Sequence, residues 1–295
     1  MKINTINQLM KKYKSPFFVI AIFLAIIALT ACQTTGPFSN AELITDPEIL
    51  PVESLCPDEI LWDDIEPGIA TTSSYIKEIN TVWKCLKIDL DTTGLEIVIK
   101  PDSTEQLGKK FFISDFAKKN EVEYAINTTP FDLGKTEIPV SITKVNGKII
   151  TPLKKKYAAL GLYNNSDGNL RGKIIEKQNE EEIAECDSVM GGFYLIYKNG
   201  EIREFTRIKR SRSGCGLSDD GRFLYLFAVA AVNYPSGRNG LNYEECALIM
   251  EKLGCDVAMQ FDGGHSTGLV ANGKDIVKPS LQRKVPAALG IRIKH

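Results

Sequence analysis

Two short and almost continuous apolar runs near the C-terminus flank one well-marked helix. The runs cover residues 223–232 and 257–261. Between them, Asn242 and Glu245 form a capping-box pattern at the start of a helix that ends at Gly254. A continuous apolar run is typical of a strand that is buried on both faces. The pattern therefore predicts a strand–helix–strand unit, with two neighbouring parallel strands and a right-handed crossover.

The rest of the chain alternates between strand-like runs and turn signals. Residues 81–100 are rich in β-branched side chains and contain the turn-like stretch 91–94, which together favour a hairpin. Asn-Gly pairs at 146–147 and 199–200 favour two further tight hairpin turns. With the C-terminal unit, these elements predict an α/β (mixed α+β) fold. We expect a mixed sheet with flanking helices in a single domain.

The first thirty residues are typical of an export signal. Four lysines precede residues 17–29, which are thirteen consecutive apolar residues, and Leu-Thr-Ala then leads to Cys32. A membrane-spanning helix needs about 20 apolar residues, so an uncleaved anchor is the less favoured alternative. The Cys at the cut resembles a bacterial lipoprotein box. That resemblance implies that Cys32 carries lipid, including palmitate, and becomes the new N-terminus.

Cleavage before Cys32 divides the chain into three parts. We expect a lipoprotein signal peptide over residues 1–31, a tether over 32–55 and one domain over 56–295. The tether mixes small and polar residues without lasting periodicity. The expected location is the bacterial cell envelope, with the protein anchored to the membrane by lipid and facing the periplasm or the exterior.

Six cysteines follow Cys32: Cys56, Cys85, Cys186, Cys215, Cys246 and Cys255. An even number of cysteines in an exported protein permits disulfides, and about fifteen full pairings are open. We expect at least one disulfide. The alternative is that several of these cysteines are small buried apolar residues.

Charge and histidine content exclude several kinds of partner. The chain has 36 basic and 37 acidic residues and a formal net charge of −1, so it has no global field for a nucleic-acid backbone. Nucleic acid is therefore not an expected partner. The two histidines, His265 and His295, are too few for a His-rich metal site. We expect neither a metal nor another cofactor.

Residues 262–267, Asp-Gly-Gly-His-Ser-Thr, carry the main chemical signal. They follow the second apolar run directly and supply a carboxylate, an imidazole and two hydroxyls. The two glycines allow a sharp turn and a close approach of the backbone to a ligand. The alternative is a plain polar turn before two strands that pair across Asn272-Gly273.

Several stretches in order resemble the phosphodiester glycosidase family, over about residues 80–295. Besides Asp262-Gly263-Gly264, they are Ile88-Asp89-Leu90, Ala125-Ile126-Asn127 with Phe131, Met190-Gly191-Gly192-Phe193 with Asn199-Gly200, Arg212-Ser213-Gly214-Cys215-Gly216, and Arg283-Lys284-Val285-Pro286 with Leu289-Gly290. The chain departs from the family pattern at His265, where Gly is common, and at Thr128-Thr129-Pro130, which replaces a Gly-Gly pair.

The resemblance implies hydrolysis of a sugar–phosphodiester bond, with a carbohydrate or sugar phosphate as substrate. Arg212 would grip the phosphate, and Asp262 would act at the sugar carbon as base or nucleophile, or bind sugar hydroxyls. His265 would move a proton. The expected substrate-binding residues are Asn127, Gly192, Gly263, Gly264, Ser266 and Thr267, with the N–H groups of Gly263 and Gly264 forming a nest for the anion.

Two kinds of function remain open from the sequence. The first is an envelope lipoprotein enzyme that processes glycans by cleaving a sugar–phosphodiester. The second is a non-catalytic envelope protein that binds glycan or has a structural role on the same fold. An enzyme would bring Asn127, Arg212 and Asp262 to one place, whereas a scaffold would scatter them.

Overall fold

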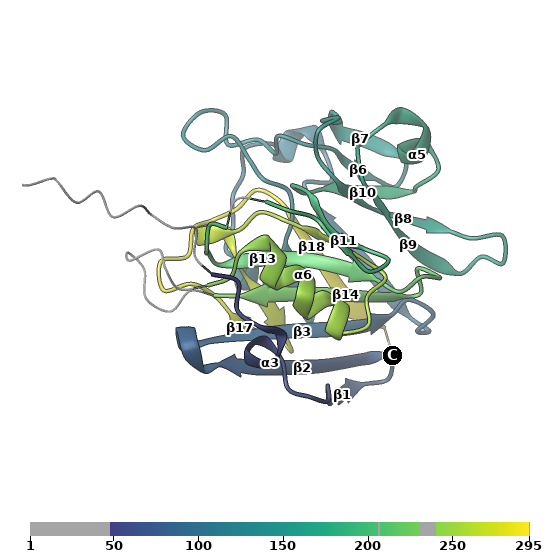
Figure 1. The fold of residues 1–295 in the computed structure, drawn as a ribbon. Helices are drawn as coiled ribbons and strands as arrows, with labels where there is room; N and C mark the ends of the chain where they lie inside the picture. The colour runs from purple at the N-terminus through teal and green to yellow at the C-terminus, as the bar shows by residue number, and fades with distance from the viewer. Residues whose placement is uncertain (1–47, 206, 231–239, 295) are drawn as a thin grey trace, which may run out of the picture. The chain divides into compact units, whose positions relative to one another are not determined.

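The computed structural model describes residues 48–205, 207–230 and 240–294 (Figure 1). By its internal contacts the chain divides into two units, Met1–Thr45 and Asp46–His295, and the fold described below is that of the second. The expected signal peptide and Cys32 lie outside the described residues. Within those residues, the longest apolar helices are too short to cross a membrane.

Three sheets form the framework of the described chain, and every strand pairing within them is antiparallel. Sheet I has eight strands, in the order β1 (Asp63–Glu66), β2 (Ile69–Ile76), β3 (Thr81–Asp89), β14 (Phe223–Val229), β13 (Arg212–Leu217), β15 (Val257–Gln260), β11 (Leu195–Lys198) and β12 (Glu201–Ile202). Sheet II has the order β7 (Lys148–Thr151), β6 (Thr143–Val145), β10 (Ser188–Gly191), β8 (Ala159–Asn164) and β9 (Leu170–Ile175). Sheet III has the order β17 (Lys274–Val277), β16 (Leu269–Ala271), β5 (Tyr124–Asn127), β18 (Ala288–Ile293) and β4 (Leu95–Lys100).

The helices are few and short. The α-helices are α3 (Val52–Leu55), α4 (Ile113–Lys119), α5 (Glu180–Ala184) and α6 (Tyr243–Lys252), and the 3₁₀ turns are Lys77–Ile79, Thr104–Gln106 and Gly264–Ser266. The longest helix, α6, begins at the expected capping box, in which Asn242 and Glu245 each accept a backbone N–H from the other. Helix α6 lies over one face of sheet I, where its backbone is nearest to β11, β12 and β15 (Figure 1).

One face of each sheet contributes to a single shared core, and the other face packs against a helix. In β14, Leu224, Leu226 and Ala228 face the shared core, whereas Tyr225 and Phe227 face α6. The outer faces of sheets III and II pack in the same way against α4 and α5. Because β14 is covered on both sides, its apolar run is continuous, as the sequence predicted.

The expected mixed α/β sheet with flanking helices is wrong: the fold is mostly β. Strands β14 and β15 point in the same direction, but they are not neighbours, because β13 lies between them and is antiparallel to both. The connection through α6 therefore passes over one strand before it returns to the sheet. The other two sheets repeat this arrangement: α4 connects β4 to β5 across β18, and α5 connects β9 to β10 across β8.

Asn-Gly turns kept their predicted conformation, whereas the turn at 91–94 did not form a hairpin. The pairs at 146–147, 199–200 and 272–273 each connect antiparallel strands, with both residues at positive φ as a tight hairpin requires. Strands β3 and β4, on either side of 91–94, belong to sheets I and III. That turn therefore leads the chain from one sheet to another.

The six cysteines after Cys32 are all unbonded and buried, so the expected disulfide is absent from the described residues. They behave as small apolar residues, which was the alternative. Burial raises the pKa of these thiols, to about 12 for Cys246, and keeps them protonated at neutral pH. Helix α3 lies within the stretch expected to be a tether, and its Leu55 is fully buried.

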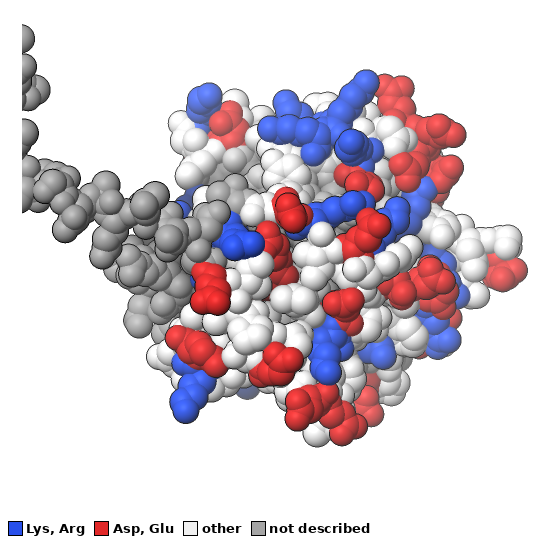
Figure 2. All heavy atoms as spheres, viewed as in Figure 1, with Lys and Arg blue, Asp and Glu red and all other residues white. Residues whose placement is uncertain are grey.

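Charged side chains of both signs are interspersed on the face that Figure 2 shows. This distribution matches the near-zero net charge of the sequence. Large electrostatic effects therefore arise locally, where particular charged groups are brought together by the fold.

Replacing Leu226 by Ala tests the shared core. We expect the free energy of unfolding to fall by about 2–5 kcal/mol, because Leu226 is fully buried between the sheets. The matched control is Leu61→Ala, at a side chain that is 70% exposed, where we expect a change below about 0.5 kcal/mol. Urea unfolding followed by tryptophan fluorescence measures both, and equal losses would contradict the assignment.

Candidate active site

The carboxamide of Asn127 joins sheets I and III. Asn127 is the last residue of β5 and is 1% exposed. Its Oδ1 accepts hydrogen bonds from Ser213 Oγ at 2.7 Å and from the Gly268 N–H at 3.0 Å. Its Nδ2 donates to the carbonyl of Asp262 at 2.6 Å. Asn127 is thus joined directly to Ser213 and to the Asp262 backbone, and Arg212, whose side chain points to the opposite face of β13 from Ser213, lies beside Gly263 of the same loop.

The Asp262 loop follows β15 and is held tightly to the start of β13. Gly264 N–H donates to the Ser211 carbonyl at 2.8 Å, and Asp262 N–H donates to the Thr128 carbonyl at 2.8 Å. A Cβ on Gly263 would lie 2.8 Å from the same Ser211 oxygen, so this position has no room for a side chain. Gly264 has φ +61°, which favours glycine. Gly263 therefore allows the loop to approach the Ser211 backbone closely, and Gly264 allows the left-handed turn.

The Asp262 carboxyl is partly accessible, yet it is densely surrounded by protein. Burial raises its pKa from 3.8 to about 6, against the opposing effects of a hydrogen bond from Ser266, the Gly263 N–H at 3.0 Å and the charge of Arg283. A carboxyl with this pKa is mostly ionised at pH 7 and still accepts a proton readily. It has the properties of a general base near neutral pH.

Arg212 is held in place before any ligand binds. Its Nε donates to the Leu241 carbonyl at 2.9 Å, its Nη2 donates to the Ile208 carbonyl, and its guanidinium lies 4.3 Å from the ring centroid of Tyr243. Burial lowers the pKa of Arg212, but arginine stays protonated at any ordinary pH. Because Nε and Nη2 already donate to protein carbonyls, an anion would bind at the outer end of the guanidinium, away from Nε.

Tyr243 connects Arg212 with Asp262. Burial is the main cause of its raised pKa, the charge of Arg212 opposes that rise, and the charge of Asp262 adds to it. Tyr243 thus contacts Arg212 through its ring, whereas Asp262 acts on its phenol through charge. Tyr243 is the first residue of α6, and the sequence gave no sign of this role.

Two more arginines, Arg210 and Arg283, belong to the site and were missed as site residues from the sequence. Arg283 interacts with the Asp262 carboxylate, and Arg210 acts on both Arg212 and His265. Arg210 precedes Arg212 by two residues on an extended stretch, a spacing that places both on one face. That spacing was the available signal, whereas Arg283 is distant in sequence and gave none.

His265 has a lowered pKa, because burial and the charges of Arg283 and Arg210 all disfavour the imidazolium. Arg283 Nη2 lies 2.9 Å from His265 Nδ1. Arginine can only donate, so Nδ1 is the acceptor and the proton of the neutral ring sits on Nε2. At neutral pH the ring is therefore an uncharged hydrogen-bond donor. We call Asp262, His265, Arg210, Arg212, Arg283 and Tyr243 the Asp262 cluster.

The remaining expected substrate ligands contact protein. The N–H groups of Gly263 and Gly264 already donate to Asp262 Oδ1 and the Ser211 carbonyl. A Cβ on Gly192 would lie 2.4 Å from the Gln260 carbonyl oxygen, so this glycine allows close strand packing. Ser266 supports the Asp262 carboxylate, and Thr267 is fully buried. These residues shape the loop around Asp262.

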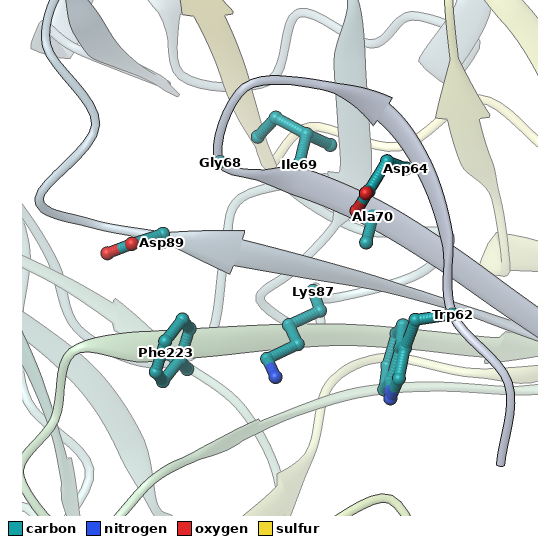
Figure 3. Close-up of a pocket in the computed structure, with 8 residues that line it drawn as sticks. All are labelled: Trp62, Asp64, Gly68, Ile69, Ala70, Lys87, Asp89 and Phe223. Carbon is teal, nitrogen blue, oxygen red and sulfur yellow. The ribbon is translucent and has the colours of Figure 1, made fainter.

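Other parts of the chain are distinct from this cluster. Trp62, Lys87 and Phe223 line a surface cavity of about 230 Å³ (Figure 3). The Lys87 ammonium lies 4.5 Å from the Phe223 ring centroid and 5.6 Å from that of Trp62. Lys87 pairs with Tyr225, whereas Arg212 pairs with Val229, four residues or about 13 Å further along β14.

Among the described residues, no three His, Cys, Asp or Glu side chains are grouped to hold a metal ion.

A sequence profile of the phosphodiester glycosidase family matches residues 120–292, more than half of the 295-residue chain. No sequence match was found among curated proteins. The profile covers Asn127, Arg212, Asp262 and Arg283, so the whole cluster falls within the matched region.

Solved structures with similar folds include proteins from Synechocystis, zebrafish and Burkholderia pseudomallei. A hypothetical protein from Synechocystis superposes with a TM-score of 0.61 at 16% identity, over 80% of this chain and 64% of that protein, so the chain spans less than two thirds of that length. The catalytic domain of zebrafish N-acetylglucosamine-1-phosphodiester alpha-N-acetylglucosaminidase, auto-inhibited by its pro-peptide, also gives 0.61 at 16% identity, over 80% of this chain and 88% of that one. A Burkholderia pseudomallei protein gives 0.53 at 13% identity, over 72% and 74%. At these identities the likeness establishes the fold alone.

The raised pKa of Asp262 predicts that Asp262→Asn stabilises the fold. Above pH 6 the wild type keeps an unfavourable buried charge, so the variant should be more stable by up to about 3 kcal/mol. The folded state takes up its proton as the pH falls from 6 to 3.8, so the advantage should shrink and vanish below 3.8. Urea unfolding at pH 7.5 and pH 4 measures it. The control is Asp219→Asn at an exposed position, and a variant no more stable than wild type at pH 7.5 would contradict the prediction.

Proposed function

The chain belongs to the phosphodiester glycosidase family, and from that premise we propose that it hydrolyses a sugar–phosphodiester bond at the Asp262 cluster. The observation that carries this proposal is a carboxyl with a raised pKa of about 6 on which Arg283 acts, in a loop whose Gly263 packs against Arg212. A carboxylate suits reaction at a sugar carbon, and arginines suit an anionic phosphate.

The single carboxylate fits the chemistry of this leaving group. Most glycosidases pair two carboxyl groups, because an alcohol leaving group needs a proton from a general acid. A phosphate monoester has a second pKa near about 6 and departs without that proton. No other Asp or Glu of the described residues contributes to the pKa shift of Asp262. The cluster therefore supplies a base or nucleophile and cations, which is what the reaction requires.

The reaction follows from these positions. The bond between the sugar carbon and the phosphate oxygen breaks, and its electron pair leaves with the phosphate monoester. Asp262 either takes a proton from the water that attacks the sugar carbon or attacks it directly and is then released by water. The outer end of Arg212, with Arg283 and Arg210, stabilises the charge on the departing phosphate. Neutral His265 donates a hydrogen bond without changing its charge.

The setting we propose for this enzyme is the bacterial cell envelope. The basic start, the short apolar run and the Cys at the cut support a lipoprotein that is anchored through lipid on Cys32. The substrate is then a carbohydrate or sugar phosphate of a glycan outside the cytoplasm.

Substitutions at two positions should separate the two chemical roles. With a panel of sugar-1-phosphodiesters, Asp262→Asn should lower kcat by about 10²–10⁴-fold while substrate binding persists. The wild-type kcat/KM should fall below pH 6, where Asp262 becomes protonated. Arg212→Lys should weaken phosphodiester substrates more than glycosides with a neutral leaving group, because the planar guanidinium is lost.

The exposed-site variant Asp219→Asn serves as the control in these assays and should behave as wild type. Product anomers, followed by NMR, distinguish a base from a nucleophile, since direct attack by Asp262 retains the configuration. If Asp262→Asn turned over a true substrate as fast as wild type, Asp262 would have no part in the reaction.

The lipid anchor is tested by Cys32→Ser. This substitution removes the thiol that would carry lipid, so the protein should leave the membrane fraction or stay unprocessed. Fractionation and mass spectrometry of the N-terminus measure the outcome, with Cys56→Ser as a comparison at a buried cysteine. Wild-type mature protein that still begins at Met1 would refute the anchor.

A further inference from the structure

A strip of five aromatic side chains adjoins the Asp262 cluster. It consists of Tyr157, Phe193, Tyr194, Phe205 and Tyr243, and we call it the aromatic strip. These residues come from the approach to β8, the connection between β10 and β11, the segment after β12, and the first turn of α6. Their neighbouring ring centroids lie 5.1 to 6.4 Å apart. The fold thus gathers rings that no sequence pattern connects.

Three of these rings take no part in the hydrophobic cores. Tyr157, Phe193 and Tyr194 are partly exposed, and none belongs to or packs against the four buried clusters of the described residues. Aromatic surface that neither fills a core nor is isolated on the surface is typical of a binding site. The strip therefore has apolar ring surface available to a ligand.

The strip is continuous with the residues proposed for catalysis. The Arg212 guanidinium lies 4.3 Å from the centroid of the Tyr243 ring. Tyr194 is held beside the loop, because its carbonyl accepts the N–H of Gln260 at 3.0 Å, two residues before Asp262. A ligand on the strip would therefore extend directly into the Asp262 cluster.

We propose that the aromatic strip is a sugar-binding subsite, which takes a ring of a glycan chain beyond the sugar at the cleaved bond. The C–H groups on one face of a pyranose carry partial positive charge and match the negative face of an aromatic ring. The steps of 5.8 Å from Tyr157 to Tyr194 and 6.4 Å from Tyr194 to Tyr243 make the strip up to about 12 Å long, which exceeds one sugar ring. Lys156, 4.8 Å from the Tyr157 ring centroid, offers a donor to sugar hydroxyls.

The link to catalysis rests on the proposed function, whereas the binding of glycan does not. Together the two assign an oligosaccharide or polymer as substrate, instead of a lone sugar phosphodiester. The strip holds the chain, and the Asp262 cluster acts on the phosphodiester within it.

Tyr157 is the position to substitute. Its ring contacts the strip and Lys156, and its backbone bonds to Lys154 and Gln178 do not need the side chain. Saturation-transfer NMR and calorimetry on the full-length protein would use chitotetraose, cellotetraose, maltotetraose and mannotetraose, each with its disaccharide. We expect one tetrasaccharide to bind more tightly than its disaccharide and Tyr157→Ala to weaken it about tenfold or more, as loss of a stacked ring does.

Two controls accompany this variant. Tyr157→Phe keeps the ring and should keep the binding, and Tyr75→Ala removes a tyrosine that is 56% exposed elsewhere and should change nothing. The subsite is overturned if no tetrasaccharide binds, or if Tyr157→Ala binds as tightly as wild type. If the protein hydrolysed short sugar phosphodiesters but its tetrasaccharide binding did not depend on Tyr157, the subsite would be refuted and the proposed function would stand. Strip-dependent binding without hydrolysis would support the subsite and count against the enzyme.

Discussion

The geometry of the candidate site depends on one buried side chain, the carboxamide of Asn127. Its three hydrogen bonds reach strand β13 of sheet I through Ser213, the segment before β16 through Gly268, and the backbone of Asp262. A buried amide that lost one of these partners would leave a polar group unsatisfied, so the three segments are fixed together. The catalytic proposal assigns this residue a positioning role. The sequence predicted that Asn127 binds substrate, and in the structure its side chain makes these three hydrogen bonds to protein groups.

A second buried polar group fixes the other side of the cluster. Lys209 and Glu245 form an ion pair at 2.7 Å, and Glu245 is fully buried. The same carboxylate accepts the N–H groups of Asn242 and Leu50, each at 3.0 Å. A buried ion pair is stable only when its remaining hydrogen-bonding groups are satisfied, as they are here. These contacts hold the first turn of α6, and with it Tyr243, against the strand that carries Arg212.

The residues of the Asp262 cluster are partly exposed and rich in positive charge. Arg283 acts on both the Asp262 carboxylate and the neutral His265, Arg210 acts on His265 and Arg212, and Arg212 lies against Gly263, so the site favours an anion although the chain as a whole is nearly neutral. Burial keeps the pKa of Asp262 near 6, which is useful in a base and unfavourable for stability at neutral pH. The same carboxylate thus serves the proposed reaction and lowers the stability of the fold. The surrounding polar contacts keep it in position.

The sequence by itself determined the local structure: the continuous apolar run of β14, the capping box at α6, the Asn-Gly hairpins and the glycine turn at Asp262. Each of these depends on residues close together in the chain, through φ/ψ preference, capping or side-chain periodicity. Only the tertiary structure decided which strands pair, and therefore the fold class. A continuous apolar run shows that both faces of a strand are covered, but it does not show which strands lie beside it. For the same reason β13 between β14 and β15, and the separation of β3 from β4 into two sheets, were not predictable. Arg283, Tyr194 and the aromatic strip gained their roles in the same way, since the charges and rings that act together there are distant in sequence and meet only when three sheets close on one core.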